Sequence, residues 1–133
     1  MTSSLQIGEY FYELLNIDAI TSVITGSVYR NQKIDDELEN IVIFVNFLTE
    51  NTNRGNQRGL VNVNILVKKE QGLHNISRIK TITDLVMNAL DTDDKENESF
   101  YYKFQQNTGV NTLLEQNTIS ILNLRYEIFL NNF

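Results

Sequence analysis

The chain has 133 residues, the size of one domain, and 41% of them are hydrophobic, which is enough for a single packed core. The lack of cysteine excludes disulfides, thiolate catalysis and cysteine-bound zinc, and a lone histidine, His74, excludes a site built from several histidines of one chain. The formal net charge of -6 disfavours general nucleic-acid binding, which needs clustered lysine and arginine opposite the phosphates. We expect one domain over residues 1–133, with no metal and no other cofactor.

The chain is predicted to begin with an amphipathic helix over residues 3–17, because Ile7, Phe11 and Leu15 fall on one helical face. This stretch lacks the basic start and the long apolar run of a signal peptide. No segment approaches the roughly 18 apolar residues that cross a membrane, so we expect no membrane contact. The next elements are expected to be a short helix, a short strand and an acidic loop, over residues 18–24, 28–30 and 31–39.

Two neighbouring strands are predicted next, over residues 41–48 and 58–68. The second alternates strictly between apolar and polar residues, as expected for a strand with one buried face. The first is apolar at almost every position, so both of its faces should be covered. Its second face, which carries Val42, Phe44 and Leu48, should either meet another subunit or be buried internally, by the second helix or by a curl of the sheet.

A long polar loop separates these two strands and contains two Arg-Gly pairs. Hairpin loops usually have about 2–5 residues, and longer ones are often functional. One interpretation is a flexible loop. The other is an arm that contacts a neighbouring subunit, with arginine side chains that pair with carboxylates. The residues assigned to this subunit-contact arm are Glu50, Asn53, Arg54, Gly55, Gln57 and Arg58.

The second half of the chain is predicted to contain one long helix and two strands. The helix covers residues 74–90, with an apolar stripe at helical spacing. The strands cover residues 100–104, after which Gly109 is a break, and residues 118–130. Since there is no βαβ alternation, we predict an α+β fold. It has a mostly antiparallel sheet, with the N-terminal and central helices packed on one face, in the order α-(α)-β-β-β-α-β-β.

Three further patterns suggest chemistry but lack its other requirements. The acidic residues 91–98 fit no EF-hand loop, because the sixth position is Glu96 and the twelfth is Tyr102. The carboxylates of residues 35–39 are neighbours in one loop, which does not place two of them across a cleft. His74 has no recognisable nucleophile or orienting group beside it in the sequence. We therefore expect no catalytic residue.

Several stretches together have a familiar layout: YFYELL in the first helix, SVYR after Gly26, ENIVIFVNFL before the polar loop, RGLVNVNILV after it, and the helix ISRIKTITDLVMNAL. This layout, over about the whole chain, resembles that of the small tail-completion and tail-terminator (head–tail joining) proteins of tailed bacteriophages. The resemblance implies an α+β fold, no catalytic residues, and closed rings, usually sixfold, between the neck and the tail tube. It also implies that hairpin loops and sheet edges contact other subunits. The family has no fixed site motif from which to carry over the role of a single residue.

We therefore expect a structural virion protein that assembles in the bacterial cytoplasm as a homo-oligomeric ring, sixfold or, alternatively, twelvefold. Its partners would be neck, connector or tail-tube proteins, and DNA would pass an acidic lumen without specific binding. One alternative is a monomeric or dimeric module that binds a peptide or ligand on its sheet, in a pocket lined by Phe100, Tyr102 and Phe104. Another is a small enzyme that uses His74 and a carboxylate.

Overall fold

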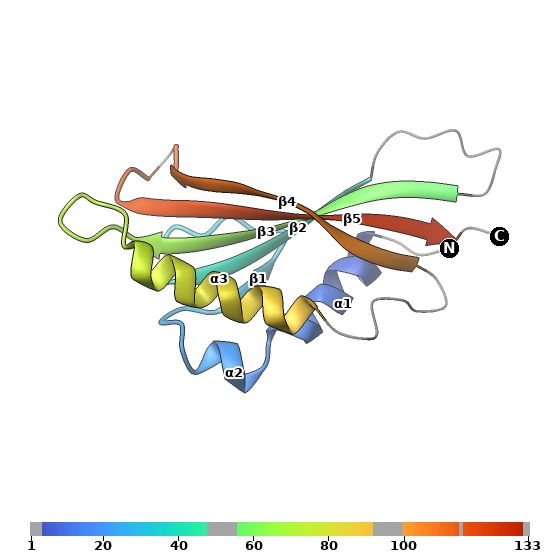
Figure 1. Cartoon of the computed structure of the whole chain (residues 1–133), viewed down its shortest axis with the longest axis horizontal. Coiled ribbons are helices and arrows are strands. Elements are labelled where there is room, and N and C mark those ends of the chain that lie inside the picture. The colour runs from blue at the N-terminus through green and yellow to red at the C-terminus, as the bar shows by residue number, and fades with distance from the viewer. Residues whose placement is uncertain (1–3, 48–55, 92–99, 115, 132–133) are drawn as a thin grey trace.

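The computed structural model describes residues 4–47, 56–91, 100–114 and 116–131, and it confirms the predicted α+β class. Helices and strands follow one another in the predicted order (Figure 1). They are α1 (Ser4–Leu15), α2 (Asp18–Thr21), β1 (Val28–Arg30), β2 (Asn40–Phe47), β3 (Asn56–Lys68), α3 (Ile76–Leu90), β4 (Phe100–Thr112) and β5 (Ile119–Asn131).

The described strands form one sheet in the order β1-β2-β3-β5-β4. The pairs β2–β3, β3–β5 and β4–β5 are antiparallel, so the predicted pairing of β2 with β3 is confirmed. β1 pairs parallel to β2, with Val28 opposite Ile41. Parallel neighbours need a crossover connection, and residues 31–39 provide it. We call this segment the crossover loop.

The described helices lie on the same face of the sheet (Figure 1). α1 contributes Ile7, Phe11 and Leu15 to the core, and α3 contributes Ile82 and Val86. Each buried side chain of this kind stabilises the fold by about 1.5–3 kcal/mol relative to an exposed one. Their partners on the sheet are the inward-facing residues Ile41, Ile43, Val61, Val63, Ile65, Leu124 and Ile128.

β3, β4 and β5 have 13 residues each, about twice the usual length of a strand. The prediction that Gly109 breaks the fourth strand after Phe104 is wrong, because β4 continues to Thr112. Gly109 has a φ of +86° and lies where the β4–β5 register shifts, between Asn107 and Val110. A positive φ costs glycine little, so Gly109 lets the strand continue through a β-bulge.

The other elements begin and end within two residues of their predicted bounds, except that α2 stops at Thr21 instead of residue 24. The long helix starts at Ile76 because Asn75 caps it: the side-chain oxygen of Asn75 accepts a hydrogen bond from the backbone N–H of Arg78 at 3.3 Å. Among the described helices, none has both the length and the apolar character needed to cross a bilayer.

The turn before β1 packs tightly against the start of β2. The N–H of Gly26 donates to the carbonyl of Glu39 at 2.8 Å, and the N–H of Ser27 donates to the side-chain oxygen of Asn40 at 2.9 Å. Asn40 is only 1% exposed, and its amide nitrogen donates to the carboxylate of Asp36 at 2.7 Å. Because buried amides need such partners, this network fixes where the crossover loop enters β2.

Candidate functional site

The face of the sheet opposite the helices, which we call the open face, is the candidate functional site. Side chains alternate along each strand, so the register assigns every second residue to this face. It is apolar at the end near the β4–β5 turn, rich in amides in the middle, and aromatic and charged at the other end. On β2, β3 and β5 it carries Val42, Phe44, Asn46, Leu60, Asn62, Asn64, Leu66, Ile121, Asn123, Arg125 and Glu127.

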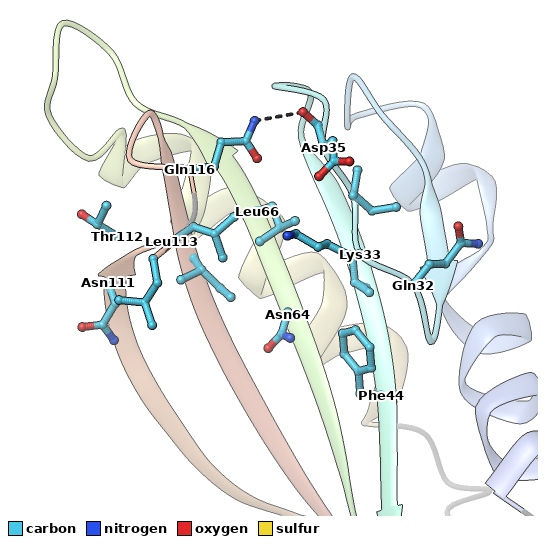
Figure 2. A pocket seen from close by; sticks show the side chains of 14 residues that line it. Gln32, Lys33, Asp35, Phe44, Asn64, Leu66, Asn111, Thr112, Leu113 and Gln116 are labelled. Atoms are coloured by element: carbon cyan, nitrogen blue, oxygen red, sulfur yellow. Dashed lines mark hydrogen bonds between the residues drawn. The ribbon is translucent and has the colours of Figure 1, made fainter.

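A pocket of ≈ 710 Å³ occupies the apolar end of the open face (Figure 2). The crossover loop forms one wall, and the end of β4 with the turn after it forms the other. The volume falls within the usual range for ligand pockets, about 300–1,000 Å³. The floor consists of Val42, Phe44, Leu66 and Ile121, with the amide of Asn64 among them.

Hydrogen bonds and an ion pair hold the two walls of the pocket together. The side-chain amide of Gln116 donates to the carbonyl of Asp35 at 3.0 Å, the dashed line in Figure 2. The hydroxyl of Thr118 donates to the carboxylate of Glu37 at 2.9 Å, and the ammonium of Lys68 lies 3.3 Å from the other oxygen of that carboxylate. These contacts fix the crossover loop over the sheet.

The predicted interface strand consisted of Val42, Phe44 and Leu48. Val42 is 3% exposed, because the crossover loop covers it and brings Ile34 against it. Neither the second helix nor a curl of the sheet covers this part of the face, since a loop of the same chain does so. Phe44 is half-buried and lines the pocket, and Leu48 lies outside the described residues. A contact of Phe44 with another subunit stays a prediction.

Side-chain amides form the middle of the open face. Nδ2 of Asn123 donates to Oδ1 of Asn64 at 2.7 Å and to Oδ1 of Asn62 at 3.3 Å. Nε of Arg125 donates to the same oxygen of Asn62 at 3.2 Å. The Oδ1 atom of Asn123 is buried and has no partner within the described part of the chain. The strict alternation predicted for residues 58–68 places Asn62 and Asn64 on one face, but it does not predict their partners on β5.

The far end of the open face combines aromatic rings with cations. Phe129 stacks on Tyr101, with ring centroids 4.7 Å apart and planes at 16°. The guanidinium of Arg58 and the ammonium of Lys103 lie 5.4 Å and 5.3 Å from the centroid of Phe129, within range of a cation–π interaction. Arg58 also pairs with the buried carboxylate of Glu127. Three strands supply this cluster, so only their register reveals it.

The structure divides the predicted subunit-contact arm. Gln57 and Arg58 lie in β3, which begins at Asn56, and not in the loop. Their contact with another subunit stays a prediction. In the part of the chain that the structure describes, the pairing of β2 with β3 ends with Phe47 opposite Gly59, and the preceding residues of β3 pair with β5. The first residues of β3, 56–58, are polar. A hydrophobic pattern detects a strand by its buried face, so it does not detect these residues. The other arm residues, Glu50, Asn53, Arg54 and Gly55, lie outside the described residues.

His74 has a partner that its sequence neighbours do not reveal. Its Nδ1 atom lies 2.5 Å from the hydroxyl of Ser120, which is 0% exposed. A substrate has no access to a fully buried hydroxyl, so this pair fastens the connection between β3 and α3 to the start of β5. In the described ranges, no three His, Cys, Asp or Glu side chains come together as metal ligands.

The pocket predicted between Phe100, Tyr102 and Phe104 is wrong, because the first two side chains lie in the core. Phe100 packs edge-to-face on Tyr10 of α1 at 5.1 Å between ring centroids, and Tyr102 packs on Phe11 at 4.9 Å. Phe104 is exposed beside this cluster. Phe100 and Tyr102 share the face of β4 that α1 covers.

Replacing Thr118 by valine should raise the pKa of Glu37. The hydrogen bond from the Thr118 hydroxyl, followed by the hydrogen bond and charge of Lys68, lowers the pKa of this carboxyl below its usual value. A lowered folded-state pKa contributes stability above the unfolded pKa, and this contribution disappears as the pH falls through the folded pKa. The midpoint of an NMR titration of Glu37 should therefore move to a higher pH in Thr118→Val. Thr108→Val, which removes a hydroxyl from β4, should leave it unchanged, and equal titrations in both variants would contradict the contact.

Comparisons with known proteins bear on the fold. No family model matches this chain, and neither does any curated protein. A solved protein structure is similar to it with a TM-score of 0.57, over 100% of this chain and 99% of the other, at 12% sequence identity. The two chains share a fold. Since one fold serves many functions, the function must be argued from the open face.

Proposed function

We propose that this protein is a structural subunit of a tailed-phage particle, which forms a ring at the head–tail junction and acts in tail termination or head–tail joining. The supporting observation is that the described helices cover one face of the sheet, while the other face carries a pocket with an apolar floor. Leu114, beside this pocket, is 99% exposed, and Leu73, in the connection before α3, is also largely exposed. Contiguous apolar surface, such as the pocket floor with Leu114 beside it, marks contacts with other proteins.

The long strands also support assembly. Beyond the described end of β2, β3 stays paired with β5, and β5 is paired on its other side with β4, so the open face continues over three strands. A neighbouring subunit would pack on this part of the open face, where Tyr101 and Phe129 are stacked.

The acidic composition fits the proposed place in the particle. A net charge of -6 repels DNA, which suits the wall of a channel through which DNA slides. Neck, connector or tail-tube proteins would be the axial partners of the ring. The layout of the sequence resembles that of the head–tail joining proteins. This resemblance is the reason for proposing that the protein is located in the virion. No step of this function needs a catalytic residue.

The purified protein should assemble into rings of one size as its concentration rises. Sedimentation velocity would detect the assembly, electron microscopy would show its shape, and native mass spectrometry would count the subunits, with six expected. The protein should also be found in purified phage particles. A chain that stays monomeric at all concentrations and is missing from such particles would overturn the proposal.

A second candidate function is a ligand- or peptide-binding module, and the pocket volume of ≈ 710 Å³ favours it. This alternative expects a lasting monomer or dimer whose melting temperature rises when a small apolar ligand or peptide is added. The same sedimentation experiment separates the two functions, because a binding module has no need to form a ring.

A further inference from the structure

We infer that the aromatic and charged end of the open face binds the junction of α1 and α2 on a second copy of this chain. This inference rests on the proposed function, because it names the surface of the neighbouring subunit that packs on the open face. We call this end of the face the basic cluster, and it consists of Arg58, Tyr101, Lys103, Arg125 and Phe129 around the buried Glu127.

Pairing across three strands brings the members of the basic cluster together. Phe129 of β5 lies opposite Arg58 of β3 on one side and opposite Tyr101 of β4 on the other. Lys103 of β4 and Arg125 of β5 lie on the same face, since side chains alternate along a strand. Two stacked rings and three cations therefore form one surface, and the side chain of Tyr101 is 39% exposed there.

The basic cluster carries an excess of positive charge on an acidic protein. It contains three of the 11 lysines and arginines of the chain, but only one of the 17 aspartates and glutamates, Glu127. The carboxylate of Glu127 pairs with Arg58. Among the described residues, Lys103 and Arg125 form no ion pair: the ammonium of Lys103 lies over an aromatic ring, and Nε of Arg125 donates to an amide oxygen. Two cations can therefore pair with carboxylates of a partner.

The junction of α1 and α2, residues 13–18, has the opposite charge. Glu13 near the end of α1 and Asp18 at the start of α2 are exposed, and no described residue forms an ion pair with either carboxylate. Ile17 lies between the two helices and is 39% exposed. The junction thus combines apolar surface with carboxylates, and the basic cluster combines aromatic surface with cations. Opposite charges arranged in this way select a partner and fix its orientation.

The two surfaces lie on opposite sides of one molecule. α1 and α2 belong to the helix layer, and the basic cluster lies on the other face of the sheet (Figure 1). A copy whose basic cluster binds one neighbour therefore presents its α1–α2 junction to the next copy. Such a heterologous contact repeats until a ring closes. A two-fold contact between two open faces would instead bring the cations of two basic clusters together, and like charges repel.

Nucleic acid fits the basic cluster less well than an acidic protein surface does. Binding to nucleic acid depends on many neutralised phosphates, and a chain with a net charge of -6 repels them around this small cluster. A base also needs a free ring on which to stack. The ring of Phe129 already contacts Tyr101 and the cations of Arg58 and Lys103. A second copy supplies carboxylates without this repulsion.

Exchanging the charges of the two surfaces tests the contact. One variant carries Lys103→Glu and Arg125→Glu, and the other carries Glu13→Lys and Asp18→Lys. Each variant alone should need a concentration about tenfold higher for half-assembly, because like charges then meet. An equal mixture should assemble within about threefold of the original concentration, into rings in which the variants alternate. In the mixture the two reversed surfaces meet each other, and so do the two unchanged ones.

Matched control variants show whether the position of each change matters. Lys69→Glu with Lys80→Glu makes the same change of net charge as the first variant, outside both surfaces, and should leave assembly unchanged. Tyr101→Ser should raise the concentration for half-assembly about tenfold, because it removes exposed aromatic surface from the contact. Phe104→Ser removes an exposed ring from the opposite face of β4 and should have no such effect. Circular dichroism would confirm that each variant is folded.

The outcomes separate this inference from the proposed function. If both charge variants form rings at the original concentration, or if their mixture stays unassembled, the contact is wrong while the ring of the original protein stands. A mixture that stops at dimers would indicate a two-fold contact and would also overturn it. So would salt-sensitive binding of a fluorescent thymidine oligonucleotide that is lost in Lys103→Glu with Arg125→Glu while assembly is unchanged. If the original protein forms no rings, both proposals fail.

Discussion

Gly26→Ala is expected to lower the free energy of unfolding by about 2–4 kcal/mol, because the added methyl group has no room. A β-carbon at Gly26 would lie 1.9 Å from the side-chain oxygen of Asn40 and 2.6 Å from the carbonyl oxygen of Glu39. The carbonyl is backbone and does not swing aside. Asn40 is buried, so moving its amide breaks the hydrogen bonds with Ser27 and Asp36.

Gly8→Ala is the matched control for this substitution. Gly8 lies in α1, and a β-carbon there would meet its nearest neighbours, Val45 and Asn31, at 3.8 Å and 3.9 Å, which is ordinary contact. Since glycine destabilises a helix interior relative to alanine, Gly8→Ala should raise stability by about 0.5–1 kcal/mol. Urea unfolding of both variants measures the difference. If Gly26→Ala were as stable as the original protein, the close packing of the turn on β2 would be wrong.

The effect of Gly26→Ala should extend to the pocket. The turn at Gly26 holds Glu39 and Asn40, the residues with which the crossover loop enters β2. The loop in turn forms one wall of the pocket and covers Val42. We therefore expect Gly26→Ala to impair assembly at temperatures where the chain is still folded, because the loop would lose its fixed end.

The fold was predictable where one face of an element is buried. The spacing of Ile7, Phe11 and Leu15 in α1 reports directly on the core, and so does the alternation from Val61 to Val67 in β3. The prediction failed where the pattern carried no such information. The first residues of β3 are polar, and Gly109 disturbs the alternation of β4 without ending the strand. In both places backbone pairing with β5 extends the strand.

The candidate site was less predictable, because it depends on contacts between distant parts of the chain. The apolar pattern of β2 predicts that the face with Val42 and Phe44 is covered. It does not predict which part of the chain covers that face. The answer depends on the parallel pairing of β1, which sends the crossover loop over that face. It also depends on the contacts of Gln116 and Thr118 with that loop, about 80 residues away in sequence. Neither contact leaves a local pattern.

Arg78→Ala is expected to lower the free energy of unfolding by about 2–3 kcal/mol, less than the loss of a fully buried ion pair because water screens part of the interaction. Nε and Nη2 of Arg78 donate to the two carboxylate oxygens of Glu39 at 2.7 Å and 2.5 Å, and Nη2 also donates to the carbonyl of Val23 at 2.8 Å. The hydrogen bond with Glu39 raises the pKa of Arg78 further above its usual value. The substitution leaves a nearly buried carboxylate without its cation.

Two control variants show whether the geometry of Arg78 or only its charge is responsible. Lys80→Ala removes a cation from the same helix, but the Lys80–Asp84 pair is highly exposed and screened by water, so the loss of stability should be much smaller than in Arg78→Ala. Arg78→Lys keeps the charge and loses the two-pronged contact, so its stability should lie between those of Arg78→Ala and the original protein. Thermal and urea unfolding would rank the variants. If Arg78→Ala cost no more than Lys80→Ala, the ion pair would not anchor α3 to the end of the crossover loop at Glu39.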